Sequence, residues 1–157
     1  MAPDPETIFS TAEVFRLGTG ALSAHLPDLM FPWVMCASFS SELYLKCLVL
    51  VEGGNYGKDH DLKMLFERLT RNSQENIRKR FEPKRAAEDA RYAAANLPAR
   101  PRTDFDYILE VSSKAFVKFR YAYEGLVGPV GWGNRLIDEC VRERIIELRP
   151  DWKNLLR

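Results

Sequence analysis

The sequence predicts an all-α protein, an antiparallel bundle of about five to six helices joined by short connections. Apolar residues recur at the i, i+3, i+4, i+7 spacing of a helix in several segments, and no segment alternates strictly as a half-buried strand does. Proline and glycine separate these segments. With 157 residues, 46% hydrophobic and 29% charged, we expect one globular domain over residues 1–157.

The charge balance and the cysteines indicate the cellular compartment of this protein and the partners that its net charge does not attract. Its 23 basic and 22 acidic residues nearly cancel, so no global field attracts nucleic acid or a membrane surface. Cys36, Cys47 and Cys140 are far apart, odd in number and surrounded by apolar residues, as reduced core thiols are. We find no signal-peptide pattern, and proline, serines and charges interrupt the most apolar window, residues 29–51. We therefore expect a cytoplasmic protein with no membrane attachment.

The first helix is expected to start at Pro5, because the Asp4 carboxylate can cap a free backbone N–H and proline at the first helical position loses nothing. It should run to about His25 and end before Pro27.

A wide apolar face after Pro32 predicts the central helix of the bundle. Glu42 and Lys46 are spaced for an i, i+4 ion pair on its more polar side, worth a few tenths of a kcal/mol if exposed. Glycines at 53 and 54 should end this helix, because glycine readily adopts the left-handed conformation that closes a helix.

Two further helices follow in the sequence. Residues 62–69 show the helical apolar spacing, with Asp59 or Asp61 able to cap the start. Asn72 and Glu75 resemble the capping box of a fourth helix, which Pro83 should end or kink. The alanine-rich segment beyond this proline offers little apolar surface, so we expect an arm that is partly buried and projects from the bundle.

The last part of the chain predicts two more helices. A continuous apolar face from Phe105 to Tyr123 predicts a second central helix, which glycines and a proline from Gly125 onward break. A final helix is expected from about Asn134 to Leu148.

Two stretches share their order and spacing with a known family. The first reads SFSSELYLKCLVL from Ser38 and is followed by the glycine pair, and the second reads DHDLKMLF from Asp59. A helix with small residues, a glutamate and a leucine-lysine pair, then a glycine-ended loop and a His-Asp-Leu helix start, resembles the HEPN superfamily of helical bundles. This resemblance implies a HEPN-like bundle fold.

The resemblance also implies a set of activities. Members include metal-independent ribonucleases, toxins paired with nucleotidyltransferase antitoxins, and non-catalytic modules that bind nucleotides or partners. Catalytic members use an arginine followed, after about four to six residues, by a histidine, which can move a proton while the arginine holds the phosphate charge. The nearest arginine is Arg120, and positions 125, 126 and 127 hold glycine, leucine and valine. The motif is absent, which favours a non-catalytic binding module over a ribonuclease with a degenerate site.

The candidate ligand-binding residues are Glu42, Lys46, His60 and Arg120, which we expect to line a cleft if the bundle has one. Arg120 and His60 are also the candidate catalytic pair of the alternative enzyme. Each has a structural interpretation: His60 can help fix the start of its helix, and Arg120 can pair with Glu124.

A dense basic cluster is the candidate nucleic-acid patch; it consists of Arg78, Lys79, Arg80, Lys84 and Arg85. Neighbouring acids dilute its field, and a solvated helix face is the alternative interpretation.

No metal site or cofactor is expected, since the two histidines are far apart, no cysteine pair has zinc spacing and no glycine-rich phosphate loop is present. The expected partners are a second copy of the chain, a protein such as a nucleotidyltransferase, or RNA or a nucleotide. Phe31, Trp33 and Tyr44 are candidates for the dimer face.

Overall fold

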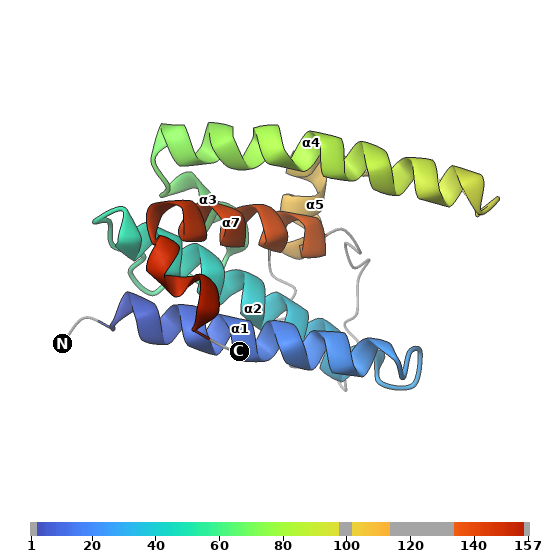
Figure 1. Ribbon diagram of the computed structural model, residues 1–157, viewed down its shortest axis with the longest axis horizontal. Coiled ribbons are helices and arrows are strands. Elements are labelled where there is room, and N and C mark those ends of the chain that lie inside the picture. Colours follow the sequence, from blue (N-terminus) through green and yellow to red (C-terminus); the bar gives the residue numbers. More distant parts are fainter. Residues whose placement is uncertain (1–2, 98–101, 114–133, 156–157) are drawn as a thin grey trace.

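A computed structural model describes residues 3–97, 102–113 and 134–155. Within these ranges all regular structure is helical, which confirms the all-α bundle (Figure 1). The elements are α1 (Pro5–Ser23), α2 (Met30–Val51), α3 (Leu62–Glu67), α4 (Arg71–Ala94), α5 (Phe105–Ser112), α7 (Asn134–Leu148) and the 3₁₀ helix η2 (Pro150–Asn154).

Helices α1 and α2 form an antiparallel hairpin (Figure 1). The Asp4 side chain accepts hydrogen bonds from the backbone N–H groups of Glu6 and Thr7, so the predicted N-cap is confirmed. Helix α1 ends at Ser23, slightly earlier than expected. Helix α2 begins at Met30, before Pro32 rather than after it, because a proline in the first turn removes no intrahelical hydrogen bond.

Helix α2 is the centre of the bundle, as predicted. Tyr44, Leu45 and Leu48 are fully buried where α1 and α7 pack against it. By length and composition alone α2 is apolar enough to cross a membrane, but 61% of that window is buried against the rest of the protein, as in the core helix of a bundle.

The third and fourth helices begin at caps that the sequence placed only in part. Asp61, not Asp59, caps α3 by accepting from the N–H groups of Lys63 and Met64. Helix α4 is capped by Thr70, so the expected capping box at Asn72 was wrong and that residue lies inside the helix. The Thr70 hydroxyl is itself anchored by Glu52, at 2.5 Å, at the end of α2.

Helix α4 does not end at Pro83 but continues to Ala94. The lost backbone hydrogen bond is offset because the chain is fixed on both sides of the proline. Phe81 is fully buried before it, and Lys84 lies 2.8 Å from Glu143 of α7 after it. As predicted, no residue from Glu82 to Leu97 is buried, and this part of α4 extends past the other helices (Figure 1).

The end of the chain confirms the last predicted helix. Helix α7 spans Asn134–Leu148, and Trp152 of η2 is buried against Phe9 of α1, with ring centroids 5.5 Å apart. Of the second predicted central helix, the described residues show α5, whose Phe105, Ile108 and Leu109 are buried; its continuation to Tyr123 lies outside them.

Candidate functional site

The Glu42 carboxylate is the buried centre of the candidate site. Its residue lies on α2 and is 1% exposed. One carboxylate oxygen, Oε1, accepts a hydrogen bond from Lys46 Nζ at 2.7 Å and lies 2.9 Å from His60 Nδ1. The fold therefore brings together three of the four predicted ligand-binding residues, from one helix and from the loop before α3.

Lys46 is buried more deeply than its predicted position on a polar face suggested. It is 8% exposed, and its ammonium lies 5.0 Å from the centre of the Tyr56 ring. The ion pair with Glu42 is therefore largely removed from solvent, so the small value of an exposed i, i+4 pair does not apply. We name Glu42, Lys46, Tyr56 and His60 the α2 cluster.

His60 has a different exposure from its partners. Its side chain is 56% exposed, whereas that of Glu42 is 2% exposed. When Nδ1 carries the ring proton, it donates to the buried carboxylate, which fixes the ring while its outer edge faces solvent. The second Glu42 oxygen, Oε2, is buried without a hydrogen-bond partner in the described part of the chain.

The His-Asp-Leu sequence connects three helices. His60 contacts Glu42 of α2, and Asp61 both caps α3 and accepts a short hydrogen bond from the Ser113 hydroxyl at the end of α5. The Leu62 N–H donates to the Ser113 carbonyl at 3.2 Å, and the Leu62 side chain is buried. This arrangement gives the sequence a structural role besides any contact with a ligand.

Replacing Asp61 with alanine is expected to lower the free energy of unfolding by about 1–2 kcal/mol, because α3 loses its cap and Ser113 loses its acceptor. Asp59→Ala is the matched control, since this carboxylate pairs with Arg68 in a partly exposed position and should matter less. Urea denaturation of both variants checks the order, and equal losses would contradict the assigned role of Asp61.

The fourth predicted ligand-binding residue, Arg120, lies outside the described residues, as do positions 125–127. The structure therefore shows the α2 cluster without the proposed phosphate-holding arginine.

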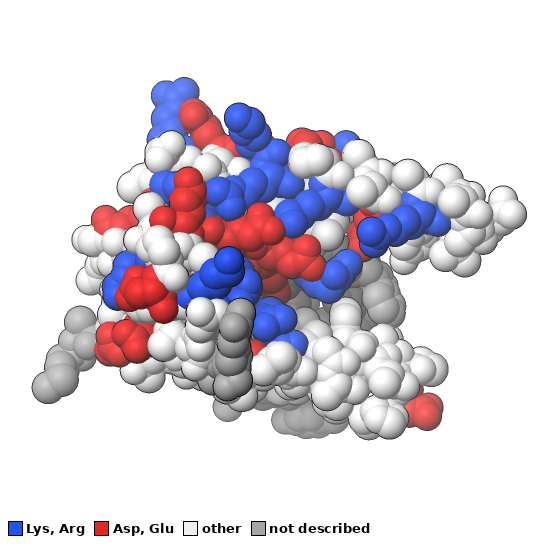
Figure 2. Space-filling view, in the orientation of Figure 1, with Lys and Arg blue, Asp and Glu red and all other residues white. Residues whose placement is uncertain are grey.

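The basic cluster is mostly paired with acids. Arg78 makes a bidentate contact with Asp106 of α5, at 3.0 and 2.7 Å. Arg80 lies 2.6 Å from Glu147, and Lys84 lies 2.8 Å from Glu143, both on α7. Figure 2 shows the result on this face, where basic side chains along α4 border acidic ones over α7.

The last two members of the basic cluster differ from each other. Arg85 pairs within α4 with Glu82 and Asp89, at 2.9 and 3.2 Å, whereas exposed Lys79 has no ion pair among the described residues. The field that a phosphate backbone meets on this surface is therefore locally balanced, although the five residues lie on one helix.

A second buried polar group was missed by the sequence analysis. Glu13 of α1 is 4% exposed and contacts Arg142 of α7 at 2.6 Å and Arg16 at 3.0 Å, and it accepts a short hydrogen bond from the Tyr44 hydroxyl. Burial alone would raise the pKa of Glu13, but the hydrogen bonds from Arg142, Tyr44 and Arg16 outweigh it and lower that pKa. We name these four residues the Glu13 cluster.

The sequence did carry a signal for this cluster. Glu13 follows Phe9 by four residues and therefore lies on the buried face of α1, where an unpaired carboxylate is costly. Tyr44 was expected on a dimer face, but this was wrong: the residue is fully buried between Glu13 and Phe9.

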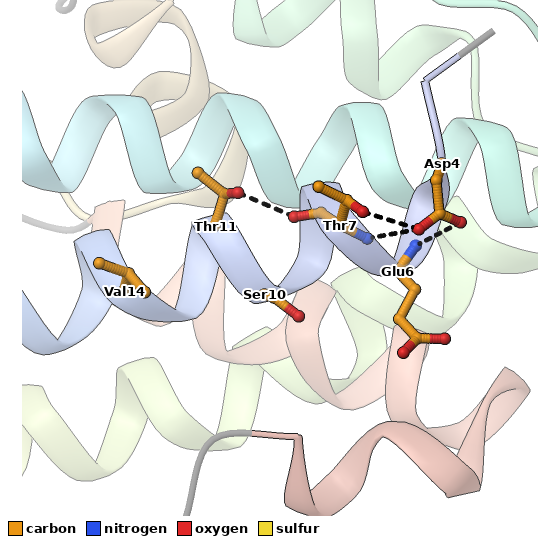
Figure 3. A pocket seen from close by; sticks show the side chains of 6 residues that line it. All are labelled: Asp4, Glu6, Thr7, Ser10, Thr11 and Val14. Atoms are coloured by element: carbon orange, nitrogen blue, oxygen red, sulfur yellow. Dashed lines mark hydrogen bonds between the residues drawn. The ribbon is translucent and has the colours of Figure 1, made fainter.

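A shallow groove along α1 is a further candidate site (Figure 3). Asp4, Glu6, Thr7, Ser10, Thr11 and Val14 line it. All of these residues belong to one helix or its cap, and the Asp4 carboxylate is already used by the cap. Within the described ranges no group of three or more His, Cys, Asp or Glu side chains is placed to hold a metal ion.

The fold and the α2 cluster together define an all-α bundle domain with a polar site on its central helix. A family model described as the HEPN domain matches residues 33–121, more than half of the 157 residues. The chain belongs to the HEPN domain family. Comparisons with curated proteins and with solved structures give no match. Helices α1 and α7, which contribute Glu13 and Arg142 to the Glu13 cluster, lie outside the matched residues.

Proposed function

We propose that this protein is a non-catalytic HEPN module that works by binding a nucleotide, RNA or a protein partner, with the α2 cluster as part of its binding surface. The observation that carries the proposal is the contact of His60 with a buried carboxylate that also holds Lys46. The contact holds the exposed imidazole edge, which comes from the loop before α3, against the rigid helix α2, and this favours recognition. The absent arginine-histidine spacing supports the non-catalytic assignment.

The binding partner can be identified directly by native mass spectrometry of the protein purified from its own cells. We expect a stoichiometric additional mass from a nucleotide, an RNA fragment or a second protein such as a nucleotidyltransferase. His60→Ala should reduce that occupancy, and His25→Ala, a change at the other, exposed histidine, should not. A protein carrying no additional mass, or equal occupancy in both variants, would overturn the proposal for this surface.

Self-association is the second part of the proposal. Exposed apolar side chains lie on the α1–α2 hairpin: Val14 is 56%, Leu17 53% and Phe31 45% exposed. Such residues can pack against a second copy, whereas Tyr44 is removed from the proposed dimer face. Light scattering at micromolar concentration is expected to give the mass of a dimer, and a stable monomer would exclude it.

The free thiols of Cys36, Cys47 and Cys140 support a location in the reducing cytoplasm.

A metal-independent endoribonuclease is the second candidate, and the geometry of His60 favours it. A buried carboxylate that orients one ring nitrogen while the other edge faces solvent is the arrangement of many acid-base histidines. Here His60 would move the proton and Arg120 would hold the phosphate. An assay on single-stranded RNA without added metal separates the two functions. Cleavage lost in both His60→Ala and Arg120→Ala, but kept in His25→Ala, would establish the enzyme; intact RNA would exclude it.

A further inference from the structure

Asp138 is a buried acid that neither candidate function uses. It lies on α7 and is 8% exposed. Val141 and Ile145 follow it at three and seven residues on the same buried face, which packs against α2. A carboxylate at such a position loses its hydration and must find a counter-charge or keep its proton.

The hydrogen bond that Asp138 makes is compatible with a retained proton. Its partner is the Ser41 hydroxyl of α2. The Ser41 hydroxyl also lies 2.9 Å from the backbone carbonyl of Ala37, to which it can donate its proton. With its proton on that carbonyl, Ser41 Oγ accepts from a protonated Asp138 carboxyl group, so the interface can hold the neutral acid with both hydrogen bonds made.

Among the residues that the structure describes, the charged groups near Asp138 do not compensate a negative charge there. On α7, Glu139 is adjacent and adds repulsion, while Arg142 is held by Glu13 through two hydrogen bonds. On α1, Arg16 is likewise bound to Glu13, and on α2 the Tyr44 hydroxyl donates to Glu13. Burial raises the pKa of Asp138 to about 8, from 3.8 for an ordinary aspartate.

We propose that Asp138 is protonated at neutral pH and that its hydrogen bond to Ser41 closes the α2–α7 interface, so that loss of this proton in mildly alkaline solution loosens α7 from α2. Ser41 directly precedes Glu42 in α2, so the proposed contact lies one residue from the α2 cluster along the helix. The inference does not depend on either candidate function, because it concerns the packing of the bundle.

The sign of the effect follows from the raised pKa. Between pH 3.8 and about 8 the folded protein holds one proton more than the unfolded chain, so this contribution to stability is complete below pH 3.8 and is lost as pH rises through 8. The unfolding constant of the natural protein, divided by that of Asp138→Asn, should rise about tenfold per pH unit between pH 5 and 8 and then level off. The asparagine is neutral and can still donate to Ser41.

Three measurements test the proposal. Urea denaturation from pH 5 to 9 should give the rising ratio for Asp138→Asn, and a constant ratio for the exposed control Asp28→Asn. Hydrogen exchange at pH 9 should be faster in α7 of the natural protein than in α7 of Asp138→Asn. The ¹³C resonance of the Asp138 carboxyl should titrate near pH 8 in the natural protein. Titration of that carbon near pH 4, or a ratio that does not change with pH, would overturn the proposal even if the variant folds poorly.

Discussion

Glu42→Ala is expected to lower the free energy of unfolding by about 3–5 kcal/mol, a large fraction of the stability of a small domain. The change removes the only carboxylate paired with the buried Lys46 ammonium in the described residues, and it releases His60 from α2. An ammonium left in that position must give up its charge or draw water into the core. Urea denaturation at pH 7 measures the loss.

Two controls identify the cause of that loss. Glu67→Ala changes an exposed glutamate on α3 and should alter stability by less than about 0.5 kcal/mol. Glu42→Leu combined with Lys46→Met removes both charges, and it should recover most of the stability that Glu42→Ala loses, because no buried charge is then left alone. A double variant as unstable as the single one would contradict the buried ion pair as the cause.

The second large effect is expected for Glu13→Ala, at about 3 kcal/mol. Glu13 joins three helices, because its carboxylate contacts Arg142 of α7, Tyr44 of α2 and Arg16 of its own helix. Its loss leaves the fully buried Tyr44 hydroxyl without an acceptor among these residues. Part of the cost is recovered because both arginines are partly exposed and can be hydrated again.

The contribution of the Glu13 carboxylate to the free energy of unfolding depends on pH. The pKa of Glu13 is lowered below 4.5 in the folded protein, so its contribution is complete above pH 4.5 and is lost as pH falls through the folded-state pKa. The difference in unfolding free energy between the natural protein and Glu13→Gln should therefore shrink in acid.

Two variants serve as controls for Glu13. Glu6→Ala, at an exposed position of α1, should change stability by less than about 0.5 kcal/mol at any pH. Tyr44→Phe removes one hydrogen bond of the cluster and should cost about 1 kcal/mol. Equal losses of unfolding free energy in Glu13→Ala and Tyr44→Phe would mean that the contacts of Glu13 with the two arginines contribute nothing to stability.

Local patterns in the sequence predicted the helices well where a helix or its cap depends only on residues close together in the chain. The cap at Asp4, the apolar face of α2 and the span of α7 depend on residues a few positions apart, and all three are confirmed. Pro83 was expected to end or kink the fourth helix, and it does not end it, because burial of Phe81 and the contact of Lys84 with α7 hold α4 in place on both sides of the proline.

The buried polar residues were likewise predicted only in part. Glu42, Lys46 and His60 were expected, together with Arg120, to line a cleft if the bundle has one, and the fold brings these three into contact. The Glu13 cluster and Asp138 were missed, because their partners lie on helices far apart in the chain; Glu13 and Arg142 are 129 residues apart.

The sequence by itself determined the all-α class, the central helix and the HEPN resemblance, since helical periodicity and a short motif are local properties. The tertiary structure decided which charged side chains are buried and which partners they have. It buries the pair of Glu42 and Lys46 that would be of little value on a surface, balances the basic face of α4 with acids of α7, and places Asp138 where a proton is held more easily than a charge. The physical reason is desolvation, which depends on all the helices packed around a group and not on its neighbours in sequence.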